Sequence, residues 1–162
     1  MDKPKSDFVN SESREHSENV AELELILNGI TEPLVLIDPQ FTIKRQNKAS
    51  VDFIKKRKTI SIRDKQCYKA LYNRDNVCPF CPFGNHDSQK ENFDDVFLEN
   101  NYSENFEREI FFKSNVKTET LYLSFFPLTK NGKIYSIVEK ISNITEIKAK
   151  DEETLRMRNL AS

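Results

Sequence analysis

The last third of the chain decides the fold, because residues 106–144 read FEREIFFKSNVKTETLYLSFFPLTKNGKIYSIVEKISNI. Apolar and polar residues alternate along residues 106–112 and again along residues 121–126, which is the period of a half-buried strand. Asn131-Gly132 then predicts a tight type I′ hairpin. Residues 134–144 continue with β-forming residues, so this segment predicts three consecutive antiparallel strands.

Two shorter strands are predicted upstream, at residues 34–37 and 41–44, on either side of the turn signal Asp38-Pro39. Strands that are grouped around a helical insertion, without β–α alternation, indicate an α+β fold. We therefore expect a five-stranded antiparallel sheet with helices on one face, flanked by N- and C-terminal helices. The predicted helices are residues 20–30, residues 48–54 with Asn47 as N-cap, residues 67–72, residues 87–99 and the C-terminal residues.

The chain divides into four regions. Residues 1–19 are polar and predict a mobile tail. Residues 20–30 predict a flanking helix, because their apolar residues repeat at spacings typical of a helical stripe. Residues 31–146 hold the globular domain. Residues 147–162 predict a second flanking helix, which reaches the last residue without a stop signal and which we expect to continue toward a further domain.

The composition argues against several classes of protein. The 25 Lys and Arg residues nearly balance the 26 Asp and Glu residues, whereas a nucleic-acid-binding domain needs a basic excess. No apolar run approaches the ~18 residues of a membrane-spanning helix, and the polar start is no secretion signal. We therefore expect a cytoplasmic domain that uses neither nucleic acid nor, within these residues, a membrane as its partner.

The three cysteines carry the most specific chemistry in the chain. Cys78 and Cys81 form a Cys-x-x-Cys pair with a proline after each cysteine, and Cys67 lies upstream on a predicted helix. With His86 as the fourth ligand they could hold zinc as a Cys3His set, or an iron–sulfur cluster with an outside ligand. Two alternatives stay open: a reversible disulfide between Cys78 and Cys81, and buried thiols that act only as small apolar side chains.

The order of elements and several short motifs resemble a PAS domain. Residues 33–38, Pro-Leu-Val-Leu-Ile-Asp, resemble the first strand of that family, residues 41–47 the second, and residues 47–50 the start of the next helix. Residues 143–146, Asn-Ile-Thr-Glu, are similar to the Asp-Ile-Thr exit of the family into a signalling helix, with Asn in place of Asp. The segment that bears the cysteines resembles a variant found in some bacterial PAS sensors.

This resemblance implies that residues 31–146 form a PAS sensory domain, the input module of a signalling protein. Residues 153–162 resemble the run that leads into the phosphoacceptor helix of sensor histidine kinases, which implies a two-component kinase as parent protein and no catalytic residue in this chain. The flanking helices are expected to pair in a homodimer and to pass a ligand, metal or redox signal to a C-terminal output domain. The alternatives are a phosphatase or cyclase as output, and a non-sensing dimerisation module that zinc stabilises.

A PAS domain is expected to hold its ligand between the sheet and the helices. The candidate pocket residues on this interpretation are Phe53, Tyr68, Phe111 and Phe125. No run of the Asn-Cys-Arg-Phe-Leu-Gln type is present to bind flavin, and His86 is an isolated histidine, a weak signal for haem. We therefore expect neither cofactor.

Overall fold

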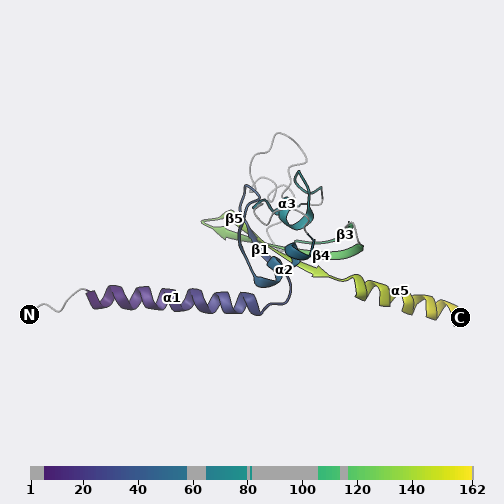
Figure 1. Ribbon diagram of the computed structural model, residues 1–162, viewed down its shortest axis with the longest axis horizontal. Coiled ribbons are helices and arrows are strands. Elements are labelled where there is room, and N and C mark those ends of the chain that lie inside the picture. The colour runs from purple at the N-terminus through teal and green to yellow at the C-terminus, as the bar shows by residue number, and fades with distance from the viewer. Residues whose placement is uncertain (1–5, 58–64, 80, 82–105, 114–116, 162) are drawn as a thin grey trace, which may run out of the picture.

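The computed structural model describes residues 6–57, 65–79, 81, 106–113 and 117–161. Its elements follow the chain in the predicted α+β order (Figure 1). They are α1 (Ser6–Gly29), β1 (Leu34–Ile37), β2 (Ile43–Gln46), α2 (Lys48–Arg57), α3 (Cys67–Tyr72), β3 (Phe106–Lys113), β4 (Thr118–Lys130), β5 (Lys133–Asn143) and α5 (Thr145–Leu160).

The strands form one five-stranded sheet in the order β2-β1-β5-β4-β3, and every neighbouring pair is antiparallel. The predicted sheet is therefore confirmed. The hairpin between β4 and β5 turns at Asn131 and Gly132, whose φ angles of 53° and 73° are both positive. Positive φ at both central residues is the requirement of a type I′ turn, which Asn-Gly meets with little strain.

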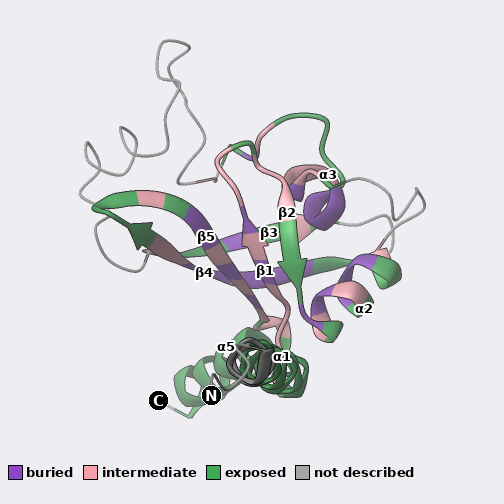
Figure 2. Ribbon diagram, turned by 90° about the vertical axis from the view of Figure 1, so that its left-hand side faces the viewer, coloured by how far each residue is buried: buried purple, intermediate pink, exposed green. Residues whose placement is uncertain are grey.

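Helices α2 and α3 pack on one face of the sheet, and the core lies between them and the strands. Figure 2 shows buried residues on the middle strands and on both of these helices. Leu121 and Leu123 of β4 and Ile137 of β5 are fully enclosed, and Leu71 contributes from α3. The longest pairing of the sheet, between β4 and β5, therefore forms the floor of the core.

The two flanking helices leave the domain in opposite directions (Figure 1). No residue of α5 is buried. Several apolar side chains of both helices are exposed, among them Leu23 at 58%, Ile26 at 56% and Leu155 at 59%. None of the helices in the described part of the chain has the length and apolar character to span a membrane.

Two sequence-based expectations about the N-terminal half need correction. The tail predicted at residues 1–19 is wrong from Ser6 onward, because α1 begins there and runs to Gly29. The sequence has no proline or glycine between Pro4 and Gly29, so no residue of this segment interrupts a helix.

The second predicted strand begins at Ile43 and not at Phe41. Phe41 takes a left-handed backbone with φ 59° and closes a turn. In this turn the Asp38 carboxylate accepts hydrogen bonds from the backbone N–H groups of Gln40 and Thr42 at 3.0 and 2.9 Å. A side chain that occupies these donors favours a turn over an extended strand. The helix predicted at residues 87–99 lies outside the described residues.

Candidate functional site

A small cavity lies between the sheet and α3. Its volume is about 20 Å³, which is room for about one water molecule. Apolar side chains, three thiols, two tyrosines and one carboxyl line it: Ile37, Phe41, Cys67, Tyr68, Tyr72, Val77, Cys78, Cys81, Phe125 and Glu139. The structure thus brings the three cysteines of the sequence to one place.

Local hydrogen bonds fix α3 against the sheet and hold Cys67 in the cavity wall. The Cys67 N–H donates to the carbonyl of Phe41 at 2.8 Å, and the Ile43 N–H donates to the carbonyl of Lys65 at 2.7 Å. At the other end, Asn73 takes a left-handed backbone with φ 52° and ends the helix. A left-handed residue after a helix is the usual helix stop, and it turns the chain back so that Val77, Cys78 and Cys81 reach the cavity.

Cys78 and Cys81 lie on one turn, where the Cys81 N–H donates to the Cys78 carbonyl at 2.9 Å. Burial raises the pKa of the Cys78 thiol to about 12, with smaller contributions from Cys81 and Glu139. Burial also raises the pKa of Cys67, and the Glu139 charge adds to this shift. These raised pKa values keep both thiols protonated at neutral pH. Only the thiolate is strongly nucleophilic, so the protonated thiols react slowly.

Glu139 supplies the acidic group of the cavity. It lies in register between Val35 of β1 and Phe125 of β4 and is 2% exposed. The Tyr72 hydroxyl donates a hydrogen bond to its carboxyl. Burial raises the pKa of Glu139 to about 7, although the hydrogen bond from Tyr72 acts in the opposite direction. This carboxyl therefore gains or loses its proton near neutral pH, as few carboxyls do.

Two of the four predicted pocket residues reach this cavity. Tyr68 and Phe125 both line it, and the Tyr68 ring packs edge-on against Phe41 at 6.4 Å between ring centres. Phe53 does not: it lies on α2, where the Arg57 guanidinium stacks 3.6 Å above its ring, and it lines a separate cleft.

The expectation that Phe111 lines the pocket is wrong, because this side chain is 78% exposed. Successive side chains of a strand point to opposite faces. Ile110 is buried and Phe112 packs against the core, so Phe111 between them points outward.

Three of the four predicted metal ligands, the cysteines, lie among the described residues. Among the described residues, no three His, Cys, Asp or Glu side chains are arranged so as to hold a metal ion, and His86 lies outside the described residues. Sequence reasoning missed Glu139 and Tyr72. The signal for Glu139 is its place in β5, because it shares the inward strand parity of Ile137 and Ile141.

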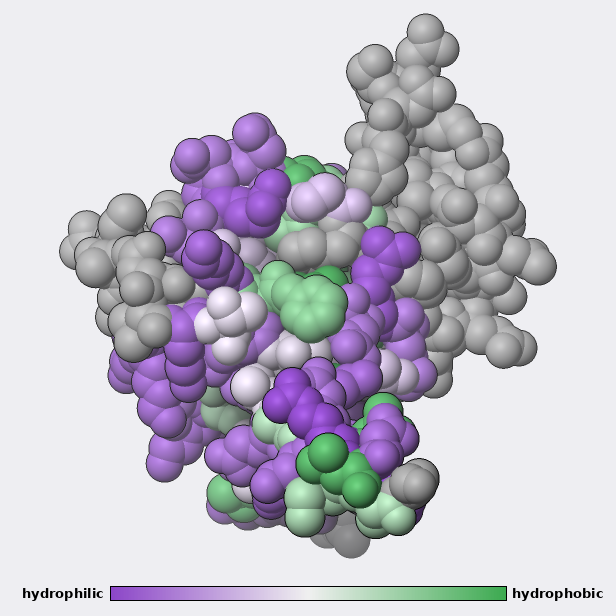
Figure 3. Space-filling model, turned by 90° about the vertical axis from the view of Figure 1, so that its right-hand side faces the viewer, coloured by the Kyte–Doolittle hydropathy of each residue, from purple (hydrophilic) through white to green (hydrophobic). Residues whose placement is uncertain are grey.

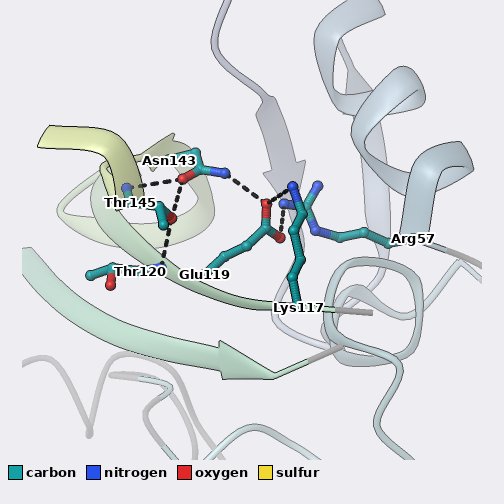
Figure 4. Close-up of polar contacts among 6 residues, drawn as sticks. All are labelled: Arg57, Lys117, Glu119, Thr120, Asn143 and Thr145. Carbon is teal, nitrogen blue, oxygen red and sulfur yellow. Dashed lines mark hydrogen bonds and ion pairs between the residues drawn. The ribbon is translucent and has the colours of Figure 1, made fainter. Parts of the chain in front are cut away.

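A second polar cluster lies at the end of the sheet, around Glu119 of β4 (Figure 4). Its carboxylate pairs with Arg57 from α2 and with Lys117, whose Nζ lies 3.1 Å from Oε1. Burial alone would raise the pKa of Glu119, but hydrogen bonds from Lys117 and Arg57 together with their charges lower it. Glu119 therefore remains ionised at neutral pH and ties α2 to the sheet.

Asn143 connects Glu119 to the start of α5. Its Nδ2 donates to Glu119 Oε1 at 2.8 Å, while its Oδ1 accepts from the backbone N–H of Thr145 at 3.1 Å. The Thr145 hydroxyl in turn accepts from the Thr120 N–H at 2.9 Å (Figure 4). An aspartate at position 143 would place a second carboxylate beside Glu119, which explains why an amide suits this exit.

Asn47 holds the opposite junction, where α1 leads into the domain. It is 1% exposed. Its Oδ1 accepts from the N–H of Ser50 at 3.0 Å, so the predicted N-cap of α2 is confirmed. Its Nδ2 lies 2.9–3.2 Å from the carbonyl oxygens of Leu27, Ile30 and Glu32. One side chain thus joins the end of α1 to α2.

Comparison with known proteins identifies the fold. No family model matches the sequence, and the search of curated proteins finds no match. Solved structures do match. The PAS domain of BvgS from Bordetella pertussis has a TM-score of 0.50 at 10% identity and covers 87% of this chain and 98% of its own.

Two further structures agree. The PAS domain of an HTR-like protein from Haloarcula marismortui has a TM-score of 0.51 at 11% identity over 83% of this chain and 99% of its own. The phage VqmA–DPO complex has a TM-score of 0.50 at 11% identity and covers 90% of this chain and 62% of its own. The chain has the PAS fold.

Proposed function

We propose that this chain is a PAS sensory module that detects a signal at the thiol-lined cavity and passes it to α5. The observation that carries the proposal is the place of Glu139. It lies in the cavity on β5, and β5 leads at Asn143 directly into α5. A shift of β5 at the cavity therefore acts on the hydrogen bonds of Asn143 and Thr145 at the end of the same strand.

We propose a soft metal ion, zinc in the first place, as the signal. Cys67, Cys78 and Cys81 line one cavity, and thiolates are preferred ligands of zinc. Binding would draw α3 and the turn of Cys78 and Cys81 together, with His86 as the proposed fourth ligand. A reversible disulfide between Cys78 and Cys81 is the alternative signal; the raised pKa values of the Cys67 and Cys78 thiols oppose thiolate formation for either chemistry.

The flanking helices are the proposed route of output. The exposed apolar side chains of α1 and α5, which include Leu23, Ile26 and Leu155, suit a parallel pairing of two chains as a coiled-coil seam does. Figure 3 shows apolar side chains among hydrophilic ones on α5, at the bottom of the view. We propose a cytoplasmic homodimer whose α5 helices lead to an output domain, a histidine kinase, as the sequence of residues 153–162 suggests.

Metal content and helix dynamics together test the sensory proposal. Anaerobically purified protein is expected to bind one zinc ion per chain, and Cys67→Ser or Cys78→Ser is expected to abolish binding. Phe111→Ser is the matched control, because this side chain is exposed and outside the cavity. Zinc is then expected to change amide hydrogen exchange in α5 as well as near α3.

The results distinguish sensing from the structural alternative. If zinc raises the melting temperature and leaves exchange in α5 unchanged, the metal only stabilises the domain and the sensory proposal is wrong. If the protein binds no metal and a reversible disulfide between Cys78 and Cys81 alters α5 instead, the signal is redox and the metal proposal is wrong.

The proposed dimer has its own test by sedimentation. Leu23→Ser removes an exposed apolar side chain from α1 and is expected to weaken self-association about tenfold. Glu22→Ser on the neighbouring, polar position is the control and is expected to have little effect. A wild-type chain that sediments as a monomer at micromolar concentration contradicts the dimer.

A further inference from the structure

An open cleft of about 390 Å³ lies beside α2 and is separate from the thiol cavity. Its walls come from three segments: the end of α1 with the linker to β1, the helix α2, and Asn143 at the end of β5. None of its lining residues belongs to the thiol cavity. The end of α1 contributes to the cleft, whereas residues of α3 line the thiol cavity.

The walls of the cleft are held in place by buried and polar contacts. The backbone N–H of Lys48, at the start of α2, donates to the side chain of Asn28 at 2.8 Å. Asn47 joins the same two helices from within the domain, through the Leu27 carbonyl of α1 and the Ser50 N–H of α2. The Arg57 guanidinium is held by the Phe53 ring and by Glu119. The cleft therefore has fixed walls on at least two sides.

The charges in the cleft are predominantly positive. Lys48, Lys56 and Arg57 line it, against the single carboxylate of Asp52. Lys48 and Lys56 lie eight residues apart on a helix, so they share one face. Within the part of the chain that the structure describes, neither lysine forms an ion pair with Asp52, whereas Lys140 and Lys148 pair with glutamates elsewhere.

Arg57 adds a donor that has no partner in the described part of the chain. Its Nε is buried and has no hydrogen-bond partner among the described residues. Buried polar groups are normally paired with protein, water or a ligand. Arg57 also lines the cleft, and an anionic oxygen is the strongest acceptor for an arginine N–H group, so Arg57 and the neighbouring lysines favour an anionic ligand.

We propose that this cleft binds a small organic polyanion, with carboxylate or phosphate groups that contact Lys48, Lys56 and Arg57. The volume lies within the range of small-molecule sites, which are about 300–1,000 Å³, so a molecule of several heavy atoms fits and a single ion would leave it largely open. The ligand would contact the end of α1, α2 and Asn143 together. Its site goes beyond the sensory function proposed for the thiol cavity and does not depend on it.

Titration calorimetry of the whole chain tests this site with three probes: citrate, glucose 6-phosphate, and glucose as the uncharged match. At least one of the two anions is expected to bind, and glucose is not. The Lys48→Gln/Lys56→Gln variant is expected to weaken anion binding about tenfold. Lys55→Gln is the matched control, because Lys55 is an exposed lysine of the same helix that does not line the cleft.

The variants carry only surface substitutions, and circular dichroism checks that each one folds. Binding of citrate alone identifies the ligand as a polycarboxylate, and binding of glucose 6-phosphate alone identifies it as a phosphate ester; either result supports the site. The proposal is overturned if neither anion binds, if the double variant binds as tightly as the wild type, or if Lys55→Gln weakens binding as much as the double variant does.

Discussion

Glu139 and Glu119 are two glutamates of the same sheet that expose almost no surface, 2% and 3% respectively, yet behave in opposite ways. Glu139 has a tyrosine hydroxyl as its neighbour, and burial raises its pKa to about 7. Glu119 has Arg57, Lys117 and Asn143 around it, and its pKa is lowered. Low solvent exposure alone therefore does not decide the charge of a carboxyl, because the depth of burial and the neighbouring cations also matter. One glutamate can respond to its surroundings, and the other holds the structure together.

The largest expected effect comes from removing the cation beside Glu119. Arg57→Met leaves a buried carboxylate that has lost its closest partner, and we expect the free energy of unfolding to fall by about 4 kcal/mol. Urea denaturation at pH 7 measures the change. The double variant Arg57→Met/Glu119→Gln removes the charge as well and is expected to recover at least half of the loss. A loss below about 1 kcal/mol for Arg57→Met would show that Lys117 and Asn143 suffice.

The next effect concerns Glu139 and depends on pH. The folded protein keeps a proton on Glu139 up to about pH 7, whereas the unfolded chain releases it near the ordinary value of 4.5. The stability of the wild type therefore falls as pH rises from 4.5 to 7 and levels off above that range, by about 3 kcal/mol in total. Glu139→Gln lacks this loss, so its advantage over the wild type is expected to grow across the same window.

Denaturation curves of metal-free protein at several pH values measure this profile. Glu119→Gln is the matched variant and is expected to show the opposite sign. Because the pKa of Glu119 is lowered, its charge stabilises the fold above the ordinary carboxyl pKa, and this contribution disappears as pH falls. A constant difference between Glu139→Gln and the wild type would mean that Glu139 does not titrate in this range.

A smaller effect is expected at Tyr72. Tyr72→Phe removes the hydrogen bond to Glu139, which should destabilise the protein by about 1 kcal/mol at pH 8 and move the titration of Glu139 to higher pH. Tyr122→Phe is the control, because its hydroxyl bonds to Glu107 at the exposed surface and its loss should change little. Equal effects of the two variants would show that the buried bond has no special role.

The smallest effect distinguishes the two cations that contact Glu119. The Lys117 side chain is 67% exposed, against 15% for Arg57, and exposed ion pairs contribute little. Lys117→Gln is expected to cost about 0.5 kcal/mol in urea denaturation. A loss as large as that of Arg57→Met would mean that both cations are needed to keep Glu119 ionised.

Local signals were sufficient to predict most of the fold. The alternation in β3 and β4, the β-forming residues of β5, the Asn131-Gly132 hairpin and the cap at Asn47 each depend on a few neighbouring residues, and all are confirmed. The start of β2 was wrong by two residues, because Asp38 binds the backbone of its own turn. The length of α1 differs from the predicted tail, because a polar segment without proline or glycine can still form a helix.

The candidate site was less predictable, because its parts come from distant segments. The cysteines were identified by their spacing alone, but Glu139 and Cys67 meet only after β5 and α3 have packed together. Phe111 was assigned to the pocket on composition, whereas the parity of the strand points it outward. The pairing of Arg57 with Glu119 spans 62 positions of the chain, and no local pattern indicates such a contact.

Asn47 also sets where the chain can be shortened. Its amide uses the carbonyls of Leu27 and Ile30, which precede the globular domain predicted to begin at residue 31. In a truncated protein that begins at residue 31, the buried Asn47 amide loses two hydrogen-bond acceptors. A protein that begins several residues before Leu27 keeps both acceptors. The last turn of α1 is therefore a structural part of the domain, and protein engineers who move this domain into another protein should transfer that turn with the sheet.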